Sequence, residues 1–302
     1  MNGFVRDIRT WSEMIKLSHS VFALPFAVMA AFLAARHLNP PHPPVGHLAL
    51  ILVCMVAARS VAMTFNRIVD AQIDARNPRT AGRPLPAGRL TRKAATLFLL
   101  FWTLVFALAC FAFRLAYGNP WPMLLGGPVL LYLCGYSYMK RFTRWSHFYL
   151  GSAIALSPPA AWLAVHPDSV GLPALLLAAA VTTWIGGFDI IYACQDIDVD
   201  RRDGLHSLPS RLGPARALTI ARISHAATVA LLAILGVEAQ LGWLYFVGVA
   251  GVALLLVIEN SLVRANDFSR VNLAFFTING VVSVLMGMLT VSDVLLGLRP
   301  PW

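Results

Sequence analysis

Long apolar runs separated by short polar segments dominate this chain of 302 residues. A helix that crosses a membrane needs about 20 consecutive, mostly apolar residues, and nine segments approach this length. The pattern therefore predicts an all-α, polytopic membrane protein with nine transmembrane helices. They are expected near residues 17–35, 48–69, 94–113, 123–139, 148–165, 172–193, 215–236, 241–258 and 273–296. Pro128 and the pair Pro158 and Pro159 are expected to kink the fourth and fifth helices.

The composition supports this class. Hydrophobic residues make up 58% of the chain and charged residues 13%, whereas a soluble domain carries about 25% charged residues. The cysteines all fall inside apolar segments, without the close spacings of a metal site. We interpret them as small core residues, with disulfide or ligand roles as the alternative.

The net charge of +10 raises the question of nucleic-acid binding, but its distribution argues against it. Among the loops, nearly all Lys and Arg residues fall in the N-terminal segment and the even-numbered loops, whereas the opposite side has Arg36, Arg114 and Arg299. Positive charge marks the cytoplasmic side of membrane proteins. We therefore expect a multi-pass protein, in a bacterial cytoplasmic membrane, with a cytoplasmic N-terminus and an external C-terminus.

The end of the second apolar segment carries the first candidate chemistry. If the helix continues through N-R-I-V-D-A-Q-I-D, then Asn66, Asp70 and Asp74 recur every fourth residue and share one face. Two carboxylates stacked in this way suit a hard cation such as Mg²⁺, which prefers oxygen ligands and leaves positions for phosphates. The basic loop that follows includes Arg79 and Arg83. Carboxylates that suit a metal ion, followed by arginines that suit phosphate oxygens, predict a diphosphate site.

A second copy of this pattern ends the sixth apolar segment. In D-I-I-Y-A-C-Q-D-I-D-V-D, the residues Asp189, Tyr192, Asp196 and Asp200 recur at helical spacing. The loop text L-P-A-G-R-L after the first motif is similar to L-P-S-R-L after the second. We interpret the chain as a single domain, 1–302, with two pseudo-repeat halves of about 17–140 and 148–296. Ionisable groups at membrane depth normally line a functional cavity.

These motifs resemble those of the UbiA superfamily of membrane prenyltransferases. The family's signatures read N-D-x-x-D-x-x-x-D and D-x-x-Y-x-x-x-D-x-x-x-D, and the loop R-T-A-G-R-P-L also matches. The resemblance covers nearly the whole chain. It implies nine helices around a central cavity, and a Mg²⁺-dependent transfer of a polyprenyl group from polyprenyl diphosphate to an aromatic acid.

One position departs from the family pattern, because Arg67 stands where the first signature commonly has Asp. Together with F-D-I-I-Y-A-C-Q-D and G-L-H-S-L-P, this text most resembles the MqnP branch, proposed to prenylate 1,4-dihydroxy-6-naphthoate in the futalosine route to menaquinone. Arg67 either touches the diphosphate or pairs with Asp70 three residues on. Arg67 and Arg59 are also the candidate partners of the acceptor's carboxylate.

The resemblance assigns roles to the remaining site residues. It implies that Asp70, Asp74, Asp196 and Asp200 hold Mg²⁺ and that Asp189 and Tyr192 line the cavity beneath the second motif. It also implies that four residues bind the oxygens of the diphosphate: Asn66, Arg79, Arg83 and Lys140.

Loss of diphosphate leaves an allylic cation, which aromatic faces stabilise by about 0.5 to 2 kcal/mol each. Tyr192, Phe188 and Phe65 are candidates. No His, Glu or Cys stands out as the base that removes the ring proton, so a carboxylate of the second motif or the diphosphate remains open. We interpret His206 and His225 as structural. Glu259 and Asn260 are interpreted as solvated, with a cavity role as the alternative.

Three other functions stay open. The acceptor could be 4-hydroxybenzoate, as in ubiquinone biosynthesis. A cation-coupled secondary transporter would use membrane carboxylates too, but such sites lie near the bilayer midplane, whereas these acids cluster at one surface beside arginines. A non-catalytic prenyl-lipid binder would keep its function after Asp70→Ala and Asp196→Ala.

Overall fold

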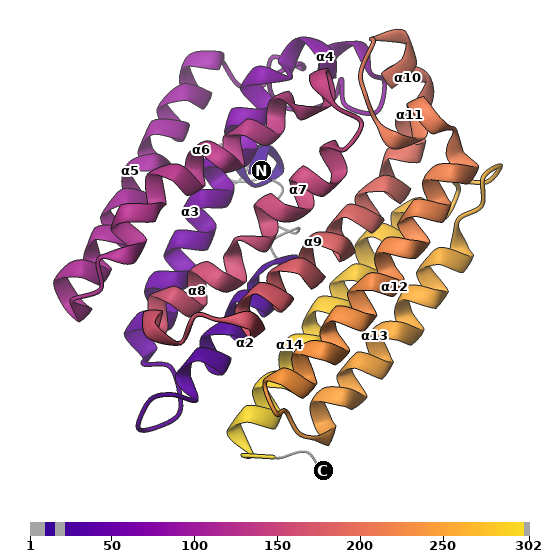
Figure 1. The fold of residues 1–302 in the computed structure, drawn as a ribbon. Helices are drawn as coiled ribbons and strands as arrows, with labels where there is room; N and C mark the ends of the chain where they lie inside the picture. Colours follow the sequence, from indigo (N-terminus) through magenta and orange to yellow (C-terminus); the bar gives the residue numbers. More distant parts are fainter. Residues whose placement is uncertain (1–9, 16–21, 299–302) are drawn as a thin grey trace, which may run out of the picture. The chain divides into compact units, whose positions relative to one another are not determined.

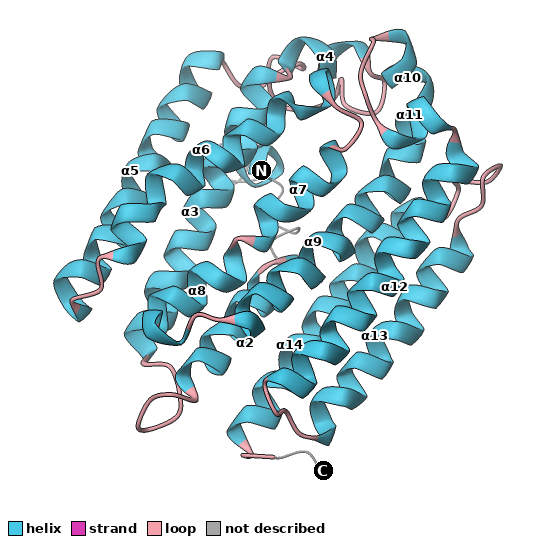
Figure 2. Ribbon diagram, viewed as in Figure 1, coloured by secondary structure: helices cyan, strands magenta, loops and turns pink. Residues whose placement is uncertain are grey.

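A computed structural model describes residues 10–15 and 22–298, and the regular elements of these residues are helical (Figures 1 and 2). The predicted all-α class is confirmed. The helices are α2 (Leu24–Ala35), α3 (Val45–Val69), α4 (Ala71–Arg76), α5 (Arg92–Tyr117), α6 (Trp121–Phe142), α7 (Ser146–Ala155), α8 (Ser157–Val165), η2 (Pro167–Ser169), α9 (Leu172–Ala193), η3 (Cys194–Asp196), α10 (Ile197–Arg202), α11 (Leu208–Leu212), α12 (Pro214–Glu238), α13 (Trp243–Leu262), η4 (Leu273–Ile278) and α14 (Asn279–Leu295).

Within the described residues, seven helical segments are long and apolar enough to cross a membrane, which identifies an integral membrane protein. The predicted count of nine is not confirmed. The first predicted span has only its part Leu24–Ala35 among the described helices, and residues 17–21 lie outside the described part. The fourth corresponds to α6, which is 22 residues long but is not among the seven.

Two of the predicted prolines have different effects on their helices. The fifth predicted span is divided into α7 and α8 at Leu156, directly before Ser157 and Pro158. Pro128 instead lies inside α6, which continues through it. The last membrane helix begins with the π-helical stretch η4, a feature that the sequence pattern did not predict. Such wider turns are rare and often mark functional sites.

The chain divides into two compact units. Among the described residues, the first holds 10–15 and 52–138, with most of α3, all of α4 and α5, and most of α6. Its helices meet in an apolar cluster around Ala57, Phe106 and Cys110, against which Leu130 of α6 packs. This unit carries the first acidic motif. All four cysteines of the chain are free; Cys110 and Cys194 are buried as core residues, whereas Cys54 and Cys134 are half-buried.

The second unit holds the described residues 22–51 and 139–298 and carries the second acidic motif. Its helix α9 packs against α7 and α12, and α12 in turn contacts α13 (Figure 1). Small residues allow the close approach of these helices. A Cβ atom on Gly151 of α7 would collide with the backbone of α9, and one on Gly187 of α9 would collide with the His225 ring of α12. The pseudo-repeat halves stay a prediction.

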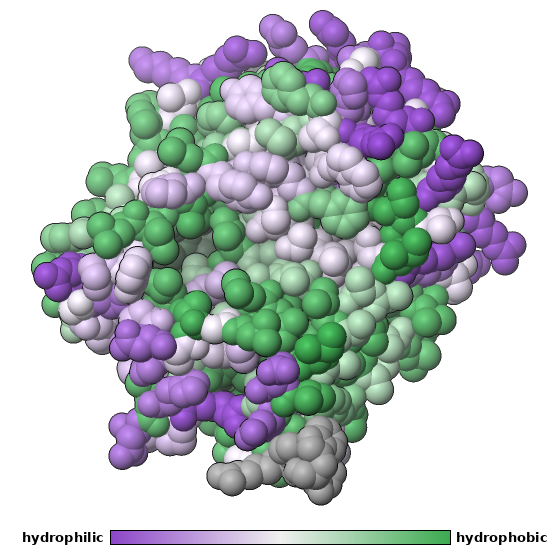
Figure 3. Space-filling model, in the orientation of Figure 1, coloured by the Kyte–Doolittle hydropathy of each residue, from purple (hydrophilic) through white to green (hydrophobic). Residues whose placement is uncertain are grey.

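Many large apolar side chains are exposed, as expected for helices that face lipid. On α5, Leu97, Leu100, Phe101, Leu104 and Leu108 are each 57–58% exposed. Figure 3 shows apolar residues over much of the visible face. A water-soluble protein rarely leaves such a continuous apolar surface uncovered, so these positions face the hydrocarbon of the membrane.

Candidate active site

The first motif keeps the predicted four-residue spacing although its helix is interrupted. Helix α3 ends at Val69, α4 begins at Ala71, and Asp70 between them departs from helical dihedral angles. The backbone N–H of Asp70 still donates to the carbonyl of Asn66 at 2.8 Å, and that of Asp74 donates to Asp70 at 2.8 Å. The three polar residues are therefore held one helical turn apart.

Their side chains form a network with two arginines. Asn66 Nδ2 donates to Asp70 Oδ2 at 2.8 Å, and Arg67 donates to Asn66 Oδ1 at 3.2 Å. Asp74 Oδ1 accepts from Arg83 at 2.6 Å, and Arg67 lies 3.9 Å from Asp74 Oδ2. The ion-pair geometry of Arg67 is thus directed to Asp74 rather than to Asp70. Arg67 and Asp74 are buried, and the negative charge of Asp74 is compensated by Arg83 and, at longer range, by Arg67.

The basic loop is ordered by its own polar residues. Thr80 Oγ1 donates to the carbonyl of Asp74 at 2.9 Å, and the Arg79 N–H donates to Asn77 Oδ1 at 2.9 Å. The Arg79 residue is exposed and Arg83 is half-buried. The two arginines therefore lie in different environments: Arg83 is paired with Asp74 of the motif, whereas Arg79 lies at the surface.

The candidate acceptor residue Arg59 lies on α3, inside the membrane span and about two turns before Asn66. Its residue is half-buried. Its role toward an acceptor stays a prediction.

The second motif is distributed over three elements. Asp189 and Tyr192 lie on α9, Asp196 lies on the short 3₁₀ turn η3, and Asp200 lies on α10. Asp196 and Asp200 are 4% and 3% exposed. The predicted single helical face is therefore interrupted at Cys194, where the α-helix tightens. Carboxylates this deeply buried require compensating cations or donors.

A histidine that sequence reasoning missed contacts this motif. His147 of α7 is fully buried, and its Nδ1 lies 2.7 Å from Asp189 Oδ2. Its Nε2 accepts the backbone N–H of Leu208 at 3.2 Å. In the sequence, His147 is marked only by its place four residues before Gly151, which packs against α9, and this position carries no chemical signal by itself. The pairing is visible only once α7 and α9 pack together.

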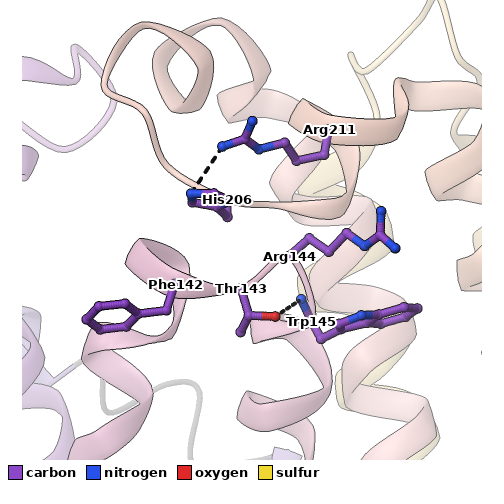
Figure 4. Close-up of a pocket in the computed structure, with 6 residues that line it drawn as sticks. All are labelled: Phe142, Thr143, Arg144, Trp145, His206 and Arg211. Carbon is purple, nitrogen blue, oxygen red and sulfur yellow. Dashed lines mark hydrogen bonds between the residues drawn. The ribbon is translucent and has the colours of Figure 1, made fainter.

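Lys140 is placed beside the loop that follows the second motif. Its carbonyl accepts the His206 N–H at 2.6 Å, and the Leu205 N–H donates to the Asp200 carbonyl at 2.8 Å. The same region contains an open depression of about 470 Å³ (Figure 4). The residues that line this depression are Phe142, Thr143, Arg144, Trp145, His206 and Arg211. Two of them are bonded to each other, since Arg211 donates to His206 Nε2 at 3.1 Å.

An aromatic cluster adjoins Asp189 along α9. The Phe188 ring lies 5.2 Å from those of Trp184 and Phe275 and 5.6 Å from that of Phe22, and the Tyr192 ring lies 4.2 Å from Phe275. Phe275 belongs to η4, so the π-helical turn supplies part of this aromatic wall. Sequence reasoning named Phe188 and Tyr192 but missed the other three rings.

The third predicted ring, Phe65, lies in the first unit. It contacts Tyr138 edge-on, with ring centroids 6.1 Å apart. Its role as a stabiliser of the allylic cation stays a prediction.

The interpretation of Glu259 as solvated is wrong. Glu259 is fully buried, and its Oε1 accepts from Asn279 Nδ2 at 2.8 Å. The Asn279 Oδ1 accepts from Trp184 Nε1 at 2.7 Å. This chain of bonds connects α13 with α14 and α9 and holds one side of the aromatic cluster. His225, interpreted as structural, is also buried, and its Nδ1 lies 2.7 Å from Asn260 Nδ2.

The carboxylates of both motifs have the chemistry of divalent-cation ligands. In the described part of the chain, no three His, Cys, Asp or Glu side chains form a metal cluster by themselves. Asp74 Oδ2 and Asp200 Oδ2 are nevertheless buried without a hydrogen-bond partner. A buried anionic oxygen of this kind fits a hard cation whose remaining ligands come from substrate phosphates and water.

Comparison with known proteins agrees with this chemistry. The model of the UbiA prenyltransferase family matches residues 23–281. The 4-hydroxybenzoate octaprenyltransferase of Sodalis glossinidius is 31% identical over 96% of each chain. That of Chromohalobacter salexigens is also 31% identical, over 79% of this chain and 76% of its own.

Solved structures show the same fold. The apo structure of a UbiA homolog from Aeropyrum pernix K1 has a TM-score of 0.80 and 30% identity, covering 91% of this chain and 98% of its own. A UbiA homolog from Archaeoglobus fulgidus, bound to GPP and Mg²⁺, has a TM-score of 0.68 and 19% identity, covering 94% and 99%.

Proposed function

The chain belongs to the UbiA prenyltransferase family, and from this premise we propose that it transfers a polyprenyl group from polyprenyl diphosphate to the ring of an aromatic acid. The predicted class of enzyme, an aromatic prenyltransferase, is confirmed by this membership and by the names of its relatives. The observation that carries the proposal is the family match over residues 23–281, which includes both acidic motifs.

The favoured acceptor is 4-hydroxybenzoate, because the relatives at 31% identity are named as its octaprenyltransferases. This was the alternative in the sequence analysis, and the comparisons support it better than the preferred 1,4-dihydroxy-6-naphthoate. One observation keeps the naphthoate as a second candidate. Arg67 replaces the usual acid of the first signature and is buried beside Asp74, so the cavity of this chain differs there from the common family pattern.

The cofactor proposed is Mg²⁺, which the Archaeoglobus fulgidus homolog binds together with GPP. When bound, the ion would neutralise negative charge that grows on the departing diphosphate. Asp70 and Asp74 would hold it in the first motif, and Asp196 and Asp200 in the second. The oxygens of Asp74 and Asp200 that have no hydrogen-bond partner support this choice.

The chain's own cations have the next role. Arg83, Arg79 and Lys140 bind diphosphate oxygens, with Asn66 as a further donor, and their charges favour the state in which the allylic C–O bond is broken. For this, the guanidinium of Arg83 would share its donors between Asp74 and the diphosphate. Its planar fork of N–H groups suits two such acceptors at once.

The aromatic cluster of the second unit would stabilise the allylic cation. The rings of Tyr192 and Phe275 lie 4.2 Å apart, tilted by 32°, beside Phe188, and ring faces attract cations without capturing them. The aromatic acid then attacks and loses a ring proton. The proton acceptor is a carboxylate of the second motif or the diphosphate.

We propose that the N-terminus and both motif loops face the cytoplasm, following the distribution of positive charge. Labelling of single cysteines on either side of inverted and right-side-out vesicles tests this. A cysteine at exposed Arg89 should react only from the cytoplasmic side, and one at exposed His42 only from the outside.

The test of function is a turnover assay with purified protein in lipid nanodiscs, Mg²⁺ and a polyprenyl diphosphate. The two acids are supplied separately and then in competition. We expect prenylated 4-hydroxybenzoate with stoichiometric release of diphosphate. Preference for the naphthoate, reversed by Arg67→Asp, would identify the second candidate. Absence of product with every aromatic acid, together with substrate-dependent ion flux, would favour a transporter instead.

A further inference from the structure

We propose that His147 is a positioning residue, which fixes the orientation of Asp189 and fastens the loop after the second motif to that carboxylate. The inference rests on the proposed function, because Asp189 is assigned to the cavity wall. It adds a residue outside both motifs and a physical connection between the cavity wall and its covering loop.

The hydrogen bonds define the tautomer of His147. A backbone N–H can only donate, so the Nε2 atom that receives the Leu208 N–H at 3.2 Å must be an acceptor. In the neutral ring the hydrogen then lies on Nδ1, which donates to Asp189 Oδ2 at 2.7 Å. Each ring nitrogen therefore has one partner, and the ring cannot flip without losing both bonds.

Because both bonds are buried, their loss is costly to the local structure. The His147 side chain is fully buried, while that of Asp189 is 15% exposed. Water has little access to this bond, and loss of the ring leaves the Asp189 carboxylate and the Leu208 N–H without that partner. The proposed role of Asp189 in the cavity wall then depends on its other oxygen. The histidine thus restricts a carboxylate that would otherwise rotate.

Leu208 connects this arrangement to the loop. It is fully buried and is the first residue of α11, whose start is ordered by reciprocal bonds between Ser207 and Ser210. The same loop is bonded to the second motif, since Arg201 Nε donates to the Ser210 carbonyl at 3.1 Å. His147 therefore joins Asp189 to a loop that also contacts the end of α10. Displacement of either partner transmits to the other.

The experiment uses the full chain in lipid nanodiscs and compares variants by two readouts. One is kcat and KM for prenyl transfer to 4-hydroxybenzoate. The other is hydrogen exchange of the peptide that contains Leu208, which needs no activity. His147→Ala removes both bonds. His147→Gln supplies one donor and one acceptor in a single planar group. His225→Gln is the matched control, because it alters another buried histidine that does not contact the motif.

We expect His147→Ala to lower kcat by about 10- to 100-fold, as removal of an orienting partner commonly does, and to accelerate exchange at Leu208. His147→Gln should recover most of both properties, and His225→Gln should change neither. Asp189→Asn should lower kcat yet keep Leu208 protected, because the amide oxygen still accepts from His147.

The inference is overturned if Leu208 exchanges equally fast with and without His147, or if His147→Gln is as impaired as His147→Ala. If His147→Ala does not fold, His147→Asn provides the comparison, since it reaches only the Nδ1 position. It should retain kcat better than it retains protection of Leu208, and the reverse result contradicts the inference. Failure of the proposed function would appear differently, as absence of product in the unmodified enzyme, and would leave the exchange result intact.

Discussion

Replacement of Arg83 by Gln tests the chemistry of the first motif. In the structure, Arg83 donates to Asp74 Oδ1 at 2.6 Å, with the side chains 20% and 8% exposed. In the proposed reaction the same guanidinium also binds the diphosphate. The substitution keeps a polar but shorter side chain and removes the positive charge and the forked donor. We expect weaker stabilisation of the departing diphosphate, and the negative charge of the Asp74 carboxylate should be less well compensated.

The magnitude follows from the geometry. A hydrogen bond to a charged group contributes about 1.5 to 3 kcal/mol, and partial exposure of Arg83 with a second cation, Arg67, 3.9 Å from Asp74 favours the lower half of this range. Since about 1.4 kcal/mol corresponds to a factor of ten, kcat/KM for the polyprenyl diphosphate should fall roughly 10- to 50-fold. The measurement is initial rate against diphosphate concentration, at saturating acceptor and Mg²⁺.

Arg89→Gln is the matched control in the same loop. Arg89 pairs with Glu13 at 2.7 Å, but their side chains are 42% and 45% exposed. An exposed pair of this kind contributes about 0 to 1 kcal/mol, so kcat/KM should stay within about threefold of the unmodified enzyme. If Arg83→Gln has no larger effect than Arg89→Gln, the assignment of Arg83 to the diphosphate is refuted.

Three further predictions concern other parts of the molecule. The Asp293 carboxylate accepts two backbone N–H groups at the start of α13. Asp293→Ala should therefore lower the free energy of unfolding by about 1 to 3 kcal/mol, and with it the melting temperature, while kcat of the folded protein stays unchanged. An unchanged melting temperature would contradict this. Arg67→Asp should lower the Mg²⁺ concentration needed for half-maximal rate, because it removes a cation beside Asp74 and adds a carboxylate that favours a divalent cation; an unaltered or higher Mg²⁺ requirement is the opposing result. Tyr192→Leu should lower kcat roughly 2- to 30-fold through loss of one cation–π contact of about 0.5 to 2 kcal/mol. Tyr192→Phe keeps the ring and should retain most of the activity. An equal loss of kcat in both variants would exclude the ring face as the cause.

The local features of the site were predictable because they depend on spacing along one helix. Asn66, Asp70 and Asp74 stay one turn apart, since their backbone hydrogen bonds persist through the junction between α3 and α4. Hydrophobic run length likewise located the membrane helices. It did not fix the number of spans, because α2 is short among the described residues and α6 carries too many polar and glycine positions.

The features that were missed depend on packing between distant segments. His147 meets Asp189 across 42 positions of sequence, and Glu259 meets Asn279 across 20. Sequence spacing gives no signal for such pairs. Phe275 was missed for a related reason, since the π-helical turn that carries it changes which residues face α9. Apolar periodicity assumes a regular helix and cannot anticipate this change.

In the proposed reaction, the carboxylates of the acidic motifs hold a metal-bound diphosphate during transfer. The decisive measurement is simultaneous quantification of prenylated acid and released diphosphate by the purified enzyme, with and without EDTA, for the unmodified chain, Asp74→Asn and Asp200→Asn. We predict equal amounts of both products, complete loss with EDTA, and at least 100-fold lower rates in each variant, equivalent to about 2.7 kcal/mol. Product formation that survives EDTA or both substitutions would contradict the account.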